Sequence, residues 1–447
     1  MIRNPDAGPS PWRGVVDYGA MQRPVGEPSD PAAEARKPTD VFQRYHSLDF
    51  LRGSMMLLGI VFHCAIAYDN TTAAAYKNWP TSEVLGFVVV GSHGFRMPIF
   101  FVLAGFFAAL LFSRRTTSGF VSNRATRIGI PLVTGWAVLS PIVGSGLVFT
   151  IAAFFLGRSV AIDLAWEMTK RGDFFFNNDT LHLWFLHYLL LFYAAMVLLS
   201  PLARRISLQP DGVATGRLRA LMGGWWRVPA LVVLTLGVLY VRPMADSATP
   251  TSFVPDAEFL LLYGFFFGFG VVLYSARDML TSFQRGAWPS LAMGLALAGV
   301  YKIAVERWLE GGASAEQWNL VAIAVNAAMI WLLFFGLVGV LLRHLDRSIP
   351  AVRYIADASY WFYLIHFPIA AWLPGLLVGL EWAPEVKFAV VLSTVLTICL
   401  VTYELFVRST YVGTILNGRR YPSLVWTGRQ KGQVLGGEPA QPNLSGR

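Results

Sequence analysis

A histidine and an arginine share one helical face in an apolar stretch, His46–Tyr68, that reads HSLDFLRGSMMLLGIVFHCAIAY. The step from Arg52 to His63 is eleven residues, about three turns or roughly 16 Å of rise, which places both side chains on nearly one face. A neutral imidazole accepts a proton from a hydroxyl, and a guanidinium grips phosphates or a carboxylate. We therefore expect His63 to do chemistry and Arg52, beside Asp49, to hold an anionic group. The plainer alternatives are a packing hydrogen bond and a lipid-headgroup anchor.

The stretch 91–107 reads GSHGFRMPIFFVLAGFF, where glycine, arginine and Pro98 interrupt apolar residues. Proline and glycine this close together predict a broken helix whose freed backbone groups face a cavity. Arg96 would then point into protein or water. Alternatively, Arg96 pairs with a carboxylate such as Asp49 or Glu404 and only holds helices together.

Two further histidines lie in apolar stretches. His182 and Trp184, in LHLWFLHY at 181–188, are candidate sugar-binding residues, because an indole stacks well on pyranose faces; an aromatic belt at the membrane interface equally explains the tryptophan. His366, in DASYWFYLIHFPI at 357–369, is either a second proton carrier or a structural partner of the first histidine.

Glu404, in VTYELFVR, is a candidate partner for Arg52, Arg96 or Arg408. Cys64 is not expected to be a nucleophile, since an apolar setting keeps a thiol protonated. The sequence contains no GxSxG elbow, P-loop, HExxH or cysteine–histidine zinc spacing. Soluble-enzyme chemistries and a metal site are therefore not expected.

These residues must be positioned by membrane helices. The chain has 447 residues, of which 55% are hydrophobic and only 14% charged, so lipid is the expected main solvent. A bilayer span needs roughly 20 apolar residues, and only helices fit. Ten windows meet this requirement, at 54–69, 85–112, 128–156, 182–202, 229–242, 257–274, 288–308, 320–342, 355–378 and 386–407. We predict an all-α polytopic bundle, in which the long windows 85–112 and 128–156 are each tilted, kinked or split.

Basic residues concentrate in the even-numbered loops, which predicts that these loops and both termini are cytoplasmic. The proline-rich residues 1–44 and residues 411–447 are interpreted as cytoplasmic tails, the first disordered, around one membrane domain at 45–410. The net charge of +9 is explained by topology and by attraction to anionic lipid, so no nucleic-acid partner is expected.

The motif LDFLRG at 48–53, followed by the Arg52 to His63 spacing, resembles the acyltransferase-3 family of bacterial membrane O-acyltransferases. Within that family the chain is most similar to the glucans biosynthesis protein C group, which is credited with succinylating osmoregulated periplasmic glucans. Six blocks carry the resemblance in order: MMLLGIVFH at 55–63, FRMPIFFVLAGFF at 95–107, RIGIPL at 127–132, HLWFL at 182–186, DASYWFYLIHFP at 357–368 and YELFVR at 403–408.

The resemblance implies a multi-pass protein of the bacterial inner membrane that moves an acyl group, succinyl or acetyl, from cytoplasmic acyl-coenzyme A to a sugar hydroxyl on the periplasmic side. It makes His63 the leading catalytic residue and puts Arg52 in the donor path. The supporting positions that it implies are Asp49, Arg96, His366 and Glu404. Many family members have Ser-Gly-Phe where this chain has Ala104-Gly105-Phe106, which argues against a role for a serine there.

As a hypothesis, His63 deprotonates a glycan hydroxyl, the alkoxide attacks the thioester carbonyl, and Arg96 stabilises the oxyanion. An acyl-histidine relay is equally permitted. A proton-coupled transporter or flippase of glycan intermediates also uses midplane histidines, but no inverted repeat is found; a structural assembly partner would not need His63. The acyl group, the glycan acceptor and the choice between monomer and homodimer stay open.

Overall fold

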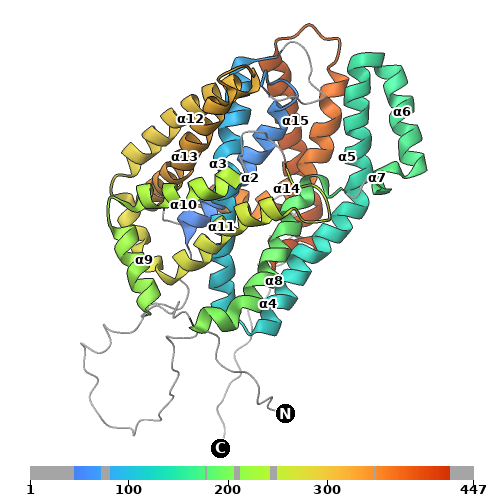
Figure 1. Cartoon of the computed structure of the whole chain (residues 1–447). Helices are drawn as coiled ribbons and strands as arrows, with labels where there is room; N and C mark the ends of the chain where they lie inside the picture. Colours follow the sequence, from blue (N-terminus) through green and yellow to red (C-terminus); the bar gives the residue numbers. More distant parts are fainter. Residues whose placement is uncertain are drawn as a thin grey trace, which may run out of the picture.

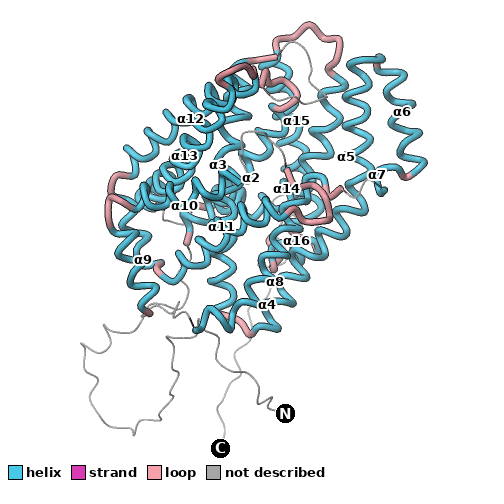
Figure 2. The backbone as a smooth tube through the Cα atoms, viewed as in Figure 1, coloured by secondary structure: helices cyan, strands magenta, loops and turns pink. Residues whose placement is uncertain are grey.

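The computed structural model describes residues 45–71, 81–176, 179–205, 212–241, 249–345 and 349–422. Figure 2 shows this part of the chain as helices joined by loops, without a strand. The all-α prediction is confirmed. The tail predicted at 1–44, and residues 423–447 of the second predicted tail, lie outside the described residues.

The helices fall on the ten predicted windows and add short segments between them. Their bounds are α2 His46–Ala65, α3 Glu83–Ser113, α4 Thr117–Arg124, a π-helical turn Ala125–Gly129, α5 Ile130–Leu156, α6 Arg158–Arg171, α7 Asp173–Phe176, a 3₁₀ turn Leu181–Leu183, α8 Trp184–Arg205, α9 Val213–Gly223, α10 Arg227–Val241, α11 Ala257–Ser275, a 3₁₀ segment Arg277–Gln284, α12 Ala287–Leu309, α13 Ala315–His344, α14 Pro350–Leu376, α15 Pro384–Thr402, a second π-helical turn Tyr403–Val407 and α16 Tyr411–Asn417.

Eight helices within the described residues are long and apolar enough to cross a membrane. A ninth span is formed if α9 and α10, which meet at a bend of 113°, are taken together. α14 occupies the ninth predicted window with 27 residues, although it carries Asp357, His366 and two internal prolines. The chain is therefore a polytopic membrane bundle.

α2 and α3 lie in the middle of the bundle (Figure 1). α2 packs against α3 and α14, and α3 packs in addition against α11, α12 and α13. α5 pairs with α6 at one edge, while α12 pairs with α13 at another. α2, which carries Arg52 and His63, and α3, which carries Arg96, are thus surrounded by protein on several sides.

α3 corrects the prediction of a broken helix, because it runs unbroken from Glu83 to Ser113 through Pro98. Proline has no N–H to donate to the carbonyl four residues earlier, which here is Gly94. Asn326 of α13 supplies the missing donor, with its Nδ2 3.1 Å from the Gly94 oxygen. Gly94 also makes room for this contact, since a Cβ there would lie 2.6 Å from Asn326 Nδ2. The helix continues because a neighbouring side chain replaces the lost backbone bond.

The window 128–156 is also one continuous span, from Thr117 to Leu156. This span is 40 residues long and contains the π-helical turn Ala125–Gly129 near its start. Single π-turns inside α-helices often occur at functional sites. The second π-turn, Tyr403–Val407, contains Glu404, so both turns coincide with motif blocks of the sequence.

The bond from Asn326 to Gly94 is expected to contribute to stability. Asn326→Leu leaves a buried carbonyl without a donor, which should lower the free energy of unfolding by about 1–3 kcal/mol. Thermal unfolding of the detergent-solubilised protein measures the change. The matched control is Asn319→Leu on the same helix, because Asn319 Oδ1 forms no hydrogen bond within the described residues. Equal losses in both variants would contradict the role given to Asn326.

Candidate active site

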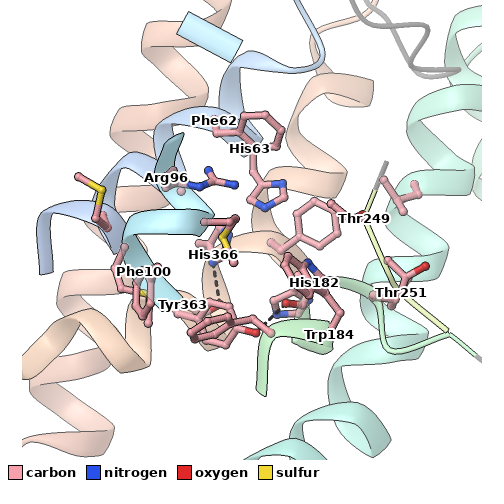
Figure 3. A pocket seen from close by; sticks show the side chains of 18 residues that line it. Phe62, His63, Arg96, Phe100, His182, Trp184, Thr249, Thr251, Tyr363 and His366 are labelled. Atoms are coloured by element: carbon pink, nitrogen blue, oxygen red, sulfur yellow. Dashed lines mark hydrogen bonds between the residues drawn. The ribbon is translucent and has the colours of Figure 1, made fainter. Parts of the chain in front are cut away.

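The three predicted functional histidines meet at one cavity in the middle of the bundle. Its volume is about 210 Å³, and its wall comes from α2, α3, α5, the 3₁₀ turn Leu181–Leu183, α8, α14 and the residues Thr249 and Thr251. Figure 3 shows His63, Arg96, His182 and His366 around it. The remaining lining is mainly apolar: Met55, Met56, Gly59, Phe62, Met97, Phe100, Leu147, Leu181, Trp184, Phe185, Thr249, Thr251, Tyr363 and Phe367.

His63 and His366 lie side by side because α2 and α14 pack closely. A Cβ on Gly53 of α2 would lie only 3.4 Å from Cα of Ala356 on α14. The two imidazole rings are 5.2 Å apart, centroid to centroid. Nδ1 of His366 is 2.9 Å from the oxygen of Phe362 and 2.7 Å from that of Tyr363. Carbonyls only accept, so Nδ1 carries the proton, and Nε2 has a free lone pair and no hydrogen-bond partner within the described residues.

His182 is held by a second carbonyl that a proline releases. Pro368 cannot donate to the Leu364 oxygen, and Nε2 of His182 lies 3.0 Å from that oxygen. The Tyr363 hydroxyl donates to the backbone oxygen of His182 at 2.7 Å. Leu181 adopts a φ of 49° just before it, a strained conformation for a residue with a side chain. These contacts hold the His182 ring 5.7 Å from that of His366, with Nε2 protonated and Nδ1 free to accept.

Arg96 is buried at 6% exposure and lines the same cavity. Its Cζ lies 4.5 Å from the centre of the Phe62 ring, and Gly59 leaves space for its Nη1, which would be 3.6 Å from a Cβ there. Nη1 has no hydrogen-bond partner in the described part of the chain.

The carboxylates considered as partners of Arg96 bind other arginines. Asp49 pairs with Arg52 at 3.5 Å, and Glu404 pairs with Arg408 at 3.7 Å while accepting from the Tyr354 hydroxyl at 3.1 Å. Neither Asp49 nor Glu404 lines the histidine cavity. Of the candidate partners Arg52, Arg96 and Arg408, Arg408 is the one that pairs with Glu404.

A second cavity of about 310 Å³ adjoins the first and is basic. Arg52, Arg124, Arg127 and Arg419 line it. Three residues belong to the walls of both cavities, and these are Met56, Phe100 and Phe185. Arg52 and His63 therefore lie on one helix but in two adjoining chambers, separated by apolar side chains.

Arg124 and Arg127 belong to the basic residues whose distribution predicts the topology, and Arg419 lies in the second predicted tail. Arg124 directly precedes the first π-helical turn and Arg127 lies within it, three residues later, a spacing that puts both on one face. The Tyr360 hydroxyl donates to the backbone oxygen of Arg127 at 2.7 Å. Arg419 reaches the cavity because the chain turns at Gly418, where φ is 75°. The three-residue spacing of Arg124 and Arg127 could have indicated from the sequence that both face one cavity. The approach of Arg419 to that cavity depends on the fold.

The tryptophan predicted to bind sugar lines the histidine cavity but is 7% exposed. Its ring is 5.3 Å from that of Tyr263 and 5.9 Å from that of Tyr188. Cys64 is a free, buried cysteine. Within the described residues no group of three or more His, Cys, Asp or Glu side chains is arranged to hold a metal ion.

Residues 45–404 match a protein family described as an acyltransferase domain. The chain is similar to a glucans biosynthesis protein C of Salmonella gallinarum, with 25% identity over 406 residues that cover 84% of this chain and 95% of the relative. Proteins of the same name from Salmonella heidelberg and Salmonella typhi are 24% identical over the same shares. No solved structure matches the chain.

His182 and His366 are predicted to be opposite neutral tautomers, with protons on Nε2 and Nδ1 respectively. ¹⁵N chemical shifts of histidine-labelled protein, assigned with His182→Gln and His366→Gln, measure this directly. Pro368→Ala is the informative variant, because the restored N–H competes for the Leu364 oxygen and should shift the His182 Nε2 signal. An Nδ1-protonated His182 in the parent protein would contradict the hydrogen-bond arrangement.

Proposed function

Because the chain belongs to the acyltransferase-3 family, we propose that it transfers an acyl group from cytoplasmic acyl-coenzyme A to a hydroxyl of a periplasmic glucan or other cell-envelope glycan. Membership of the family supports an acyltransferase activity. The long apolar helices of this chain support a multi-pass membrane protein. The name of the Salmonella relatives, glucans biosynthesis protein C, supports a glucan as acceptor. The proposed membrane is the bacterial inner membrane.

The observation that carries the proposal is the pair of adjoining cavities along α2. One contains four arginines and the other contains the histidines and Arg96. An acyl-coenzyme A molecule has a similar division, since its phosphates carry several negative charges and its acyl end carries far less charge. A donor with its phosphates at the arginines would reach the histidines by passing Met56, Phe100 and Phe185, which form the shared wall.

Arg52, Arg124, Arg127 and Arg419 provide guanidinium groups for the donor phosphates, which arginine binds through paired N–H donors. Asp49 holds Arg52 in place through their ion pair. The excess of basic residues at this end supports a cytoplasmic location for it. The donor thus enters from the side where coenzyme A is found, and only its acyl end needs to reach the middle of the bundle.

His63 acts as the general base in the histidine cavity. It takes the proton of the glycan hydroxyl, and the resulting alkoxide attacks the thioester carbonyl. The tetrahedral intermediate collapses with cleavage of the carbon–sulfur bond, and the proton held by His63 passes to the departing coenzyme A thiolate. His366 is a positioning residue, whose unprotonated Nε2 is available to accept an N–H from the His63 ring 5.2 Å away.

The proposed acceptor side of the cavity is formed by Thr249, Thr251, His182 of the 3₁₀ turn and Trp184 at the start of α8. The Thr251 backbone oxygen accepts from the hydroxyl of Thr180 at 2.6 Å, which ties this segment to the turn that carries His182. The two threonine side chains and His182 supply polar groups for a sugar hydroxyl beside His63.

His63→Ala should abolish acyl transfer, because it removes the base. We expect the acceptor-dependent rate of coenzyme A release to fall about 100-fold or more. The assay uses purified protein in nanodiscs with succinyl- or acetyl-coenzyme A and a β-glucan acceptor.

Cys64→Ala is the matched control, since Cys64 is the adjacent buried residue and has no part in the reaction. Loss of activity in both variants would indicate a packing defect. Absence of coenzyme A release by the folded parent protein with either donor would contradict the acetyl and succinyl forms of the proposal.

Arg127→Gln tests the donor cavity. Loss of one charge-assisted hydrogen bond to a phosphate should raise KM for acyl-coenzyme A about tenfold, with kcat little changed because the thioester end is bound elsewhere. Arg285→Gln, on an exposed arginine, controls for the general loss of positive charge. An unchanged KM in Arg127→Gln would place the phosphates outside this cavity.

A further inference from the structure

Arg96 places a positive charge in the histidine cavity without a negative charge to match it. Its Nη1 has no hydrogen-bond partner, and no carboxylate forms an ion pair with Arg96 within the described residues. A buried ion without a counter-charge loses much of its hydration energy. The imbalance points to an anion that arrives with the ligand, since arginine cannot shed its proton as lysine or histidine does.

The phosphates of the donor are not that anion in the proposed arrangement. Four other arginines line the adjoining cavity, and the three apolar residues of the shared wall separate that cavity from Arg96. The glycan acceptor contributes hydroxyl groups to the histidine cavity. The acyl group itself is the remaining carrier of negative charge.

We infer that Arg96 is a specificity-determining residue that selects acyl groups ending in a carboxylate, such as the succinyl group. The inference rests on the proposed function. A guanidinium binds a carboxylate through two parallel N–H donors, and Arg96 is held for this over the face of Phe62. Methionine and phenylalanine side chains around it, including Met55, Met97 and Phe100, suit the methylene groups of such a chain.

The positions of Arg96 and His63 fit a short dicarboxylic chain. The Phe62 ring contacts both, with Cζ of Arg96 4.5 Å from its centre and the His63 ring 5.0 Å from it. The end carbons of a four-carbon chain are about 3.8 Å apart, the span of three single bonds in the extended form. In the proposed arrangement the carboxylate of a succinyl group faces Arg96 while its thioester carbonyl faces His63, in the cavity that both residues line.

The test compares two donors of equal chain length, succinyl- and butyryl-coenzyme A, which differ by the terminal carboxylate. The ratio of kcat/KM for succinyl to that for butyryl transfer is measured for the parent protein, Arg96→Gln and Arg96→Lys in nanodiscs. We expect Arg96→Gln to lower this ratio about 100-fold, as for the loss of one partner of a buried charge pair. Arg96→Lys should keep an intermediate ratio, because it retains the charge but not the paired donors.

Arg307→Gln is the matched control, since Arg307 is an exposed arginine paired with Glu310, and its ratio should equal that of the parent. An equal loss with both donors in Arg96→Gln and Arg96→Lys would overturn the inference, because Arg96 would then act on the oxyanion common to both reactions. A parent protein that uses butyryl as well as succinyl donors would overturn it too, while leaving the acyltransferase proposal standing. A folded parent protein that uses no acyl-coenzyme A would instead contradict the proposed function itself.

Discussion

The arrangement of this bundle depends on the rule that a backbone carbonyl buried in an apolar setting must find a donor. Pro98 and Pro368 each remove the N–H that their helices would have offered, at Gly94 and Leu364 respectively. Side chains of other helices replace both donors, with Asn326 bonding the first oxygen and His182 the second. One replacement keeps α3 continuous beside Arg96, and the other fixes a histidine at the cavity. The prolines thus specify which helices meet and where their polar side chains lie.

This bonding also fixes the polar side chains of the histidine cavity. The same α14 segment accepts from His182 at Leu364, donates to His182 through the Tyr363 hydroxyl and fixes the His366 tautomer through its own carbonyls. Each ring therefore has one nitrogen committed to the scaffold and one with a free lone pair. The ring of His63 lies beside that of His366 and is partly accessible. Such a division between structural and available nitrogens is what a histidine base and its positioning partner require.

The two adjoining cavities along α2 differ in charge. The arginine cavity at one end carries several guanidinium groups, with Asp357 as the acidic residue in its wall. The histidine cavity carries one guanidinium and neutral or titratable rings. Because apolar side chains separate the two, a molecule that occupies both must be strongly anionic at one end and weakly charged or neutral at the other. This pattern unites the proposed donor and the proposed choice of acyl group in one physical description.

The sequence by itself determined that the protein is an all-α membrane bundle and that Arg52 and His63 lie on one helix. Hydropathy and helical period are local properties, so they can be read from the sequence. It also singled out Arg96, His182 and His366 as polar residues in apolar stretches. Only the tertiary structure decided that the three histidines and Arg96 share a cavity and that α3 passes through Pro98 unbroken. It also brought Arg124, Arg127 and Arg419 together. These outcomes depend on contacts between residues 182 and 232 positions apart, which no local pattern records.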